Sequence, residues 1–164
     1  MKGKLSVSAA AAAVAAALVG MAVVAAEAPK PMGIGTKFIL AGKVMQADGI
    51  GKNGETFALI YEENGTTSGN GPDHKMHCLG VLQGAAGMVA EQHGYCIETD
   101  LDGDQVLWKV TPAAHPLGPA SLQTVHEAIA GTGKYAGISM TMKSTDRAES
   151  TGPMAYALKG EVTQ

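Results

Sequence analysis

Aromatic residues and arginine are both scarce in this chain of 164 residues. It contains one Trp, four Tyr and two Phe, which limits the volume of any aromatic core. Lys and Arg together number 12 against 15 Asp and Glu, and Arg147 is the single arginine. Because the lysines are scattered singly, they form no basic patch for phosphates, and we exclude nucleic acid as a partner.

The first 26 residues have no charge after Lys4. Residues 1–4 are basic, residues 5–24 are rich in Ala, Val and Leu, and small residues precede Glu27. This order is typical of a secretory signal peptide, which we expect to end at Ala26. An uncleaved membrane anchor is the alternative, because the apolar run approaches the length that spans a bilayer. Cleavage would leave 10 basic and 15 acidic residues, a net charge of −5 instead of −3.

The leader also predicts where the protein resides. An Ala-rich leader is typical of bacterial export, so we predict a periplasmic or secreted protein that meets the membrane only through an uncleaved leader. We divide the chain into a signal peptide (1–26), an extended lead-in rich in Pro and Gly (27–35) and a single domain (36–164). The oligomeric state stays open.

The mature chain lacks long helical patterns. Short segments with period-two alternation are separated by turn signals, which predicts an all-β fold. We expect strands near residues 36–47, 55–62, 74–83, 89–99, 105–111 and 138–142, and a last strand that begins near Met154. Residues 121–130 fit either a strand or a helix, and we favour the strand because its neighbours are strands. A strand would place His126 on one face with Leu122, Thr124 and Ala128.

Glycines and prolines supply the expected connections. We interpret the glycines as turn punctuation, and residues 63–73 as a mobile polar loop that includes the Asn64-Gly65 turn signal. Residues 112–119 contain three prolines, which should interrupt strand pairing. About eight strands with mostly short connections predict a small antiparallel barrel of the calycin type, whose interior is filled or holds one small ligand.

Only two cysteines are present, Cys78 and Cys96. In an exported protein two cysteines usually pair. If residues 74–83 and 89–99 form a hairpin centred on Gly87, the two cysteines lie nine residues on either side and face each other. We therefore predict a Cys78–Cys96 disulfide. A redox-active or metal-binding pair is the alternative.

Two segments resemble metal sites. Residues 73–78 contain two His, a Met and a Cys, but strand alternation would separate His77 from His74, Met76 and Cys78. Asp100, Asp102 and Asp104 resemble the start of a calcium loop, but the twelfth position, Thr111, is not the Glu that such a loop requires. We interpret the second segment as a solvated hairpin turn, and we predict no metal site and no cofactor.

A short C-terminal motif suggests a family. The sequence Gly131-Thr132-Gly133-Lys134-Tyr135 leads into a predicted strand, and residues 156–160 follow as a closing strand. This pattern resembles the late strands of the allene oxide cyclase and dirigent-like barrels, and residues 94–104 resemble uncharacterised secreted bacterial proteins that share it. The resemblance implies an eight-stranded barrel whose lumen holds apolar or phenolic small molecules. It supplies no catalytic residues.

Two functions remain open at this stage. The first is an exported, disulfide-stabilised barrel that binds a small apolar ligand or a partner protein without turnover, with Trp108, Met140, Met142 and Tyr156 expected to face the lumen. The second is a cyclase or isomerase that confines its substrate in the barrel and uses Glu98 as a buried acid, with Tyr61 or Tyr135 as polar partner. The sequence alone does not decide whether the protein is an enzyme.

Overall fold

A computed structural model describes residues 34–51, 55–69, 71–86, 88–112, 115–116 and 121–163. The predicted signal peptide lies outside these ranges, as does the predicted lead-in up to residue 33. Within the described residues, no helix has the length and apolar character needed to cross a membrane.

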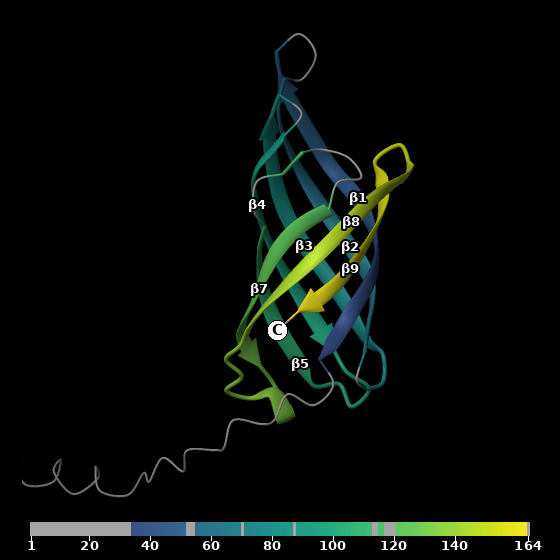
Figure 1. Cartoon of the computed structure of the whole chain (residues 1–164), viewed down its shortest axis with the longest axis vertical. Coiled ribbons are helices and arrows are strands. Elements are labelled where there is room, and N and C mark those ends of the chain that lie inside the picture. The colour runs from purple at the N-terminus through teal and green to yellow at the C-terminus, as the bar shows by residue number, and fades with distance from the viewer. Residues whose placement is uncertain are drawn as a thin grey trace, which may run out of the picture.

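The domain is an all-β, antiparallel barrel of eight strands, as predicted. Figure 1 shows long, tilted strands wrapped around one axis. The sheet order is β3-β2-β1-β9-β8-β7-β5-β4, and the pairing of β3 with β4 closes it. The eight strands are β1 (Gly35–Ile50), β2 (Thr56–Gly69), β3 (His74–Ala85), β4 (Met88–Thr99), β5 (Gln105–Pro112), β7 (Ser121–Gly131), β8 (Thr141–Gly152) and β9 (Ala155–Thr163).

Alternation along the strands places one set of side chains inside the barrel. In β1, Phe38 and Leu40 are buried, whereas the alternate residues Lys37 and Ile39 are exposed. In β5, Val106, Trp108 and Val110 are all buried, as their shared face predicts. The ambiguous segment 121–130 lies within strand β7, with Thr124, His126 and Ala128 buried. Period two is therefore the pattern that determines this core.

The predicted loop at residues 63–73 is wrong over most of its length. Strand β2 continues to Gly69 and pairs with both β1 and β3 as far as Thr67. Gly65 makes no turn: a Cβ at this position would lie 2.0 Å from the carbonyl oxygen of Ile39 on β1. The glycine instead permits the close approach of two strands, and Glu63 is buried at a position where a loop was expected.

Three smaller differences concern strand ends. The prolines at 112–119 do not fully prevent pairing, because Pro112 ends β5 opposite Thr124 and the two-residue strand β6 (His115–Pro116) pairs with β4. Met154 was expected in the last strand, but it lies in the β8–β9 turn with a positive φ of 62°. Ile138 and Met140 precede β8 and pack against the core from a short irregular segment after the 3₁₀ turn η1 (Gly133–Tyr135).

Candidate functional site

The barrel encloses a cavity of about 220 Å³. Most of its lining is aliphatic or aromatic, and every strand of the barrel contributes at least one residue. Its polar wall groups are Tyr61, Glu63, Gln92, Thr124, His126, Asp146 and Tyr156. Such a wall, mainly apolar with a few polar groups, is typical of small-molecule sites.

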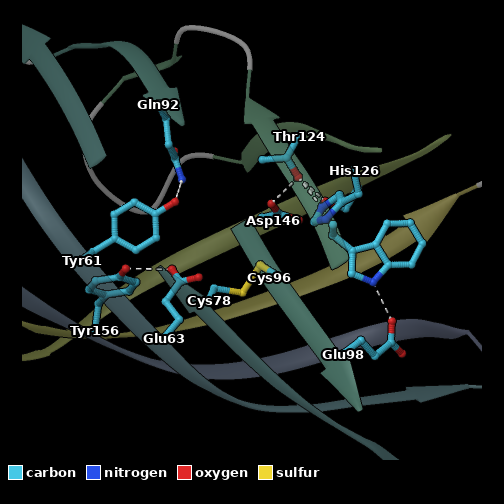
Figure 2. The surroundings of a disulfide bond; sticks show 12 residues. Tyr61, Glu63, Cys78, Gln92, Cys96, Glu98, Thr124, His126, Asp146 and Tyr156 are labelled. Carbon is cyan, nitrogen blue, oxygen red and sulfur yellow. Dashed lines mark hydrogen bonds between the residues drawn. A yellow bond between two sulfur atoms is a disulfide. The ribbon is translucent and has the colours of Figure 1, made fainter. Parts of the chain in front are cut away.

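Glu63 on β2 and Tyr156 on β9 form the first polar pair of the cavity. The Tyr156 hydroxyl donates a hydrogen bond of 2.7 Å to Oε1 of Glu63 (Figure 2). Burial raises the pKa of Glu63 to about 7, and the nearby charge of Asp146 adds to this increase, whereas the Tyr156 hydrogen bond opposes it. Glu63 is therefore a carboxyl group that changes its charge near neutral pH inside an apolar cavity.

Tyr61 forms the second pair with Gln92. Gln92 Nε2 donates a 2.7 Å hydrogen bond to the Tyr61 hydroxyl, which leaves the phenol its own proton to donate. Burial, together with the charge of Glu63, raises the pKa of Tyr61, so the phenol is neutral at ordinary pH. Tyr61 and Glu63 lie two residues apart on β2 and face the same side, so both reach the cavity.

Several glycines within strands make room for the aromatic rings. A Cβ at Gly42 would lie 2.2 Å from the Tyr156 ring, and one at Gly80 would lie 2.3 Å from the Tyr61 ring. A Cβ at Gly160 would lie 2.1 Å from the ring of Phe38. The prediction that the glycines mark turns is therefore wrong for these positions. Each of these glycines lies within a strand and leaves room for an aromatic ring against its backbone.

A third polar group surrounds His126 on β7. Its Nε2 lies 2.9 Å from both the Thr124 hydroxyl and the Ser144 hydroxyl, and these two hydroxyls also contact each other. Thr124 donates a 2.8 Å hydrogen bond to Oδ2 of Asp146 on β8. Burial lowers the pKa of His126 to about 4, so its ring is neutral at neutral pH and is a weak base.

Glu98 belongs to a separate, closed network. Its Oε1 accepts a hydrogen bond from the Thr67 hydroxyl at 2.8 Å and lies 2.9 Å from Nδ1 of His74. Its Oε2 accepts a 3.0 Å hydrogen bond from the Trp108 indole (Figure 2). Glu98 is buried but is absent from the cavity wall. These contacts occupy both oxygens, so Glu98 supports the core rather than facing a ligand.

The predicted disulfide is present. Cys78 on β3 lies directly opposite Cys96 on β4, with a Cα–Cα distance of 4.0 Å. The prediction that the two cysteines face each other across this hairpin is thus confirmed, although a register shift between Gln83 and Gly84 breaks the symmetry nearer the turn. Both cysteines line the cavity, and the Glu63–Tyr156 pair and the His126 group flank the disulfide in Figure 2.

The acidic turn after β4 is exposed at residues 101–103, as predicted, but its first residue, Asp100, is held by hydrogen bonds. Asp100 Oδ1 accepts backbone N–H bonds from Asp102 and Asp104, and Lys134 Nζ lies 2.7 Å from Oδ2 of Asp100. Burial would raise the pKa of Asp100, but the Lys134 hydrogen bond and the two backbone N–H groups outweigh it and hold the pKa below its usual value. The turn was predicted correctly, but Asp100 is buried.

The two histidines of the segment 73–78 contact different carboxyl groups. His74 faces inward onto Glu98, whereas His77 faces outward and lies 3.1 Å from Glu62. In the part of the chain that the structure describes, no group of three or more His, Cys, Asp or Glu side chains is arranged to hold a metal ion.

Two of the seven predicted site residues, Tyr61 and Tyr156, line the cavity. Trp108 and Met142 are buried core residues, and Met140 packs against that core. Tyr135 is buried beside the acidic turn, where burial and the charge of Asp100 raise its pKa to about 12. The catalytic and ligand-binding roles expected for these residues stay predictions, and the structure adds Glu63 to the residues that line the cavity.

Sequence reasoning missed Glu63, Gln92 and Asp146 as cavity residues. Glu63 was assigned to a loop, although it continues the alternation of Phe57, Leu59 and Tyr61. That alternation was the available signal, and the Asn-Gly dipeptide that follows it concealed the strand. Asp146 follows Met142 and Ser144 on the inner face of β8 by the same period of two.

Comparison with known proteins finds no match to this chain among family models, curated proteins or solved structures. The closed barrel agrees with the fold that the C-terminal resemblance implied, but no family is identified for this chain.

Proposed function

We propose that this protein is an exported barrel that binds one small, mostly apolar molecule in its lumen. The observation that carries the proposal is the cavity of about 220 Å³ in the barrel, whose apolar wall holds a few polar side chains. Sites of this composition bind small molecules by apolar contact and orient them with a few hydrogen bonds.

The size of the cavity limits the ligand. An apolar protein cavity of about 150 Å³ accommodates benzene. A cavity of about 220 Å³ therefore suits a molecule with one ring and a short substituent. The polar groups near the disulfide would orient that substituent, and the aliphatic wall would contact the ring.

The export part of the proposal rests on sequence and on the disulfide. The predicted leader supports a periplasmic or secreted location, and a disulfide between two cross-strand cysteines is typical of oxidising compartments. Kinship with the allene oxide cyclase and dirigent-like group belongs to the same proposal. It is supported by the closed eight-stranded barrel and by a lumen suited to a small ring compound.

A thermal-shift screen with neutral, cationic and anionic single-ring compounds tests the binding function. We expect at least one class to raise the melting temperature in a concentration-dependent way. Ala148→Leu places extra volume at the cavity wall and should weaken that ligand at least tenfold, whereas Ala41→Leu on the outer face of β1 should not. A panel without any stabilising compound would refute the proposal.

Isomerisation or cyclisation is a second candidate function. It is favoured by Glu63, a cavity-facing carboxyl group with a pKa of about 7, beside the two phenols of Tyr61 and Tyr156. Such a group can take a proton from carbon and return it elsewhere. The test is exchange of the α-proton of a ring ketone for deuterium in D₂O, followed by NMR. Exchange that Glu63→Gln abolishes supports this function, and exchange at the buffer rate excludes it for that substrate class.

Binding of a partner protein stays a prediction. Its surface would be the outer face of β2, β3 and β4, where apolar side chains are exposed at Ile60, Leu79, Val81, Tyr95 and Ile97. Because these residues point away from the lumen, substituting them should affect binding of a partner protein and leave binding of a small molecule in the lumen unchanged.

A further inference from the structure

We infer that the ligand of the lumen is a small organic cation: a single-ring ammonium compound whose charged nitrogen binds at Glu63 and whose ring contacts the apolar wall. This inference rests on the proposed function, namely that a small molecule occupies the lumen. It adds the charge of that molecule and the residue that recognises it.

The charges of the cavity wall carry the inference. Both carboxyl groups of the wall, Glu63 and Asp146, line the same cavity, and the described residues that line it include no Lys or Arg. Glu63 is only 6% exposed, and the hydrogen bond from Tyr156 is a neutral one. A buried carboxylate is costly unless a positive charge compensates it. A bound ammonium group would provide that charge.

The aromatic residues of the wall suit the same ligand. Tyr61, Tyr156 and Phe38 all contribute to the cavity lining, and Tyr61 and Tyr156 both lie near Glu63. The face of an aromatic ring attracts a cation, more strongly where water is excluded. A carboxylate together with tyrosine rings can therefore hold an ammonium group, and the ligand's ring can lie along the aliphatic wall.

The surroundings of Glu63 determine how binding depends on pH. Its cross-strand neighbours, Gly42 on β1 and Cys78 on β3, carry no ionisable group. Tyr156 on β9, Tyr61 on β2 and Asp146 on β8 interact with it, and His126 on β7 faces the same cavity in its neutral form. An alkylammonium keeps its proton through neutral pH, as Lys does. Glu63 is then the group whose ionisation controls the affinity near neutral pH.

Three compounds of nearly equal shape test the charge of the ligand. Isothermal titration of the purified, disulfide-bonded protein at pH 8 compares phenethylamine, 2-phenylethanol and phenylacetate. We expect phenethylamine to bind at least tenfold more tightly than 2-phenylethanol, and phenylacetate to bind most weakly. Because the comparison uses the wild-type protein, it does not depend on how any variant folds.

Two matched variants and a pH series locate the recognition at Glu63. Glu63→Gln should remove the preference for phenethylamine over 2-phenylethanol, and Glu62→Gln, one residue away on the outer face, should retain it. Below pH 7, the affinity for phenethylamine should fall by about tenfold per pH unit as Glu63 takes up its proton. The affinity for 2-phenylethanol should stay nearly constant.

Two results would overturn the inference, and they differ in what they leave standing. If 2-phenylethanol or phenylacetate binds as tightly as phenethylamine, the ligand is not recognised by its positive charge, but binding in the lumen survives. If none of the three compounds nor any other single-ring compound binds, the proposed function fails together with the inference.

Discussion

Tyr156 donates a hydrogen bond of 2.7 Å to the carboxyl group of Glu63, although 93 residues separate the two along the chain. The contact joins β9 to β2 through the interior of the barrel, across β1, which lies between them in the sheet. Because β1 presents Gly42 at this level, the Tyr156 ring can lie against the backbone there. The Glu63–Tyr156 pair thus depends on three strands, β1 and β2 from the start of the domain and β9 from its end.

Glu63 should make the stability of the protein depend on pH. Its pKa is about 7 in the folded state and near 4.5 otherwise, so the folded state binds the proton more tightly. Stability from this group is present below about pH 4.5 and is lost as pH rises through about 7, by on the order of 3 kcal/mol. Urea unfolding at a series of pH values should show this decline in the wild type and not in Glu63→Gln. The same decline in Glu63→Gln would assign it to another group.

Glu98→Gln should destabilise the domain without altering the lumen. The carboxylate accepts hydrogen bonds from Thr67 and Trp108 and contacts His74, so an amide leaves at least one buried group without its partner. We expect a loss of about 2–4 kcal/mol in urea unfolding. Ligand affinity at a temperature where the variant is folded should match the wild type. A selective loss of affinity with unchanged stability would place Glu98 in the binding site instead.

Gly42→Ala should be costly, because the new methyl group would lie 2.2 Å from the Tyr156 ring. Displacement of the ring would disturb the Glu63 hydrogen bond and cost about 1–3 kcal/mol, as for other overpacked cores. Gly152→Ala is the control, since nothing lies within 4 Å of the added Cβ. Thermal unfolding of the two variants measures the difference. Equal melting temperatures would show that the ring adjusts freely.

Removing the Cys78–Cys96 disulfide should lower stability by about 3 kcal/mol, because the bond closes a loop with a sequence separation of 18. In a domain of this size the change corresponds to a fall in melting temperature of about 10 °C. Calorimetry with and without reductant measures it, and Cys78→Ala/Cys96→Ala checks the result without reductant. An unchanged melting temperature after verified reduction would mean that strand pairing alone holds β3 and β4.

The barrel could be predicted from sequence because its strands alternate between inner and outer residues over much of their length. Val106, Trp108 and Val110 illustrate this, and the position of Cys78 and Cys96 about a common centre predicted their pairing correctly. Both are local patterns with a period of two. They predict the structure correctly because the sheet of the barrel buries only one of its faces.

The cavity could not be predicted in the same way. Its wall brings Glu63 together with Tyr156, and no local pattern relates residues so distant along the chain. The role of Gly42 and Gly80 could not be predicted either. In sequence, a glycine that lies beneath an aromatic ring cannot be distinguished from a glycine in a turn. For Glu98, the burial was predicted correctly, but its partners were not. Its two oxygens contact Thr67, His74 and Trp108.

Methyl NMR during titration with phenethylamine or 2-phenylethanol is the most direct test that the lumen is a ligand site. Methyl groups of Leu40, Leu82, Val110 and Leu158 line the cavity, whereas those of Ile39, Leu79 and Val81 are exposed on the outer face. The account predicts saturable shifts of the first set alone. Shifts confined to the outer set, or no shift at millimolar concentrations of either compound, would contradict it.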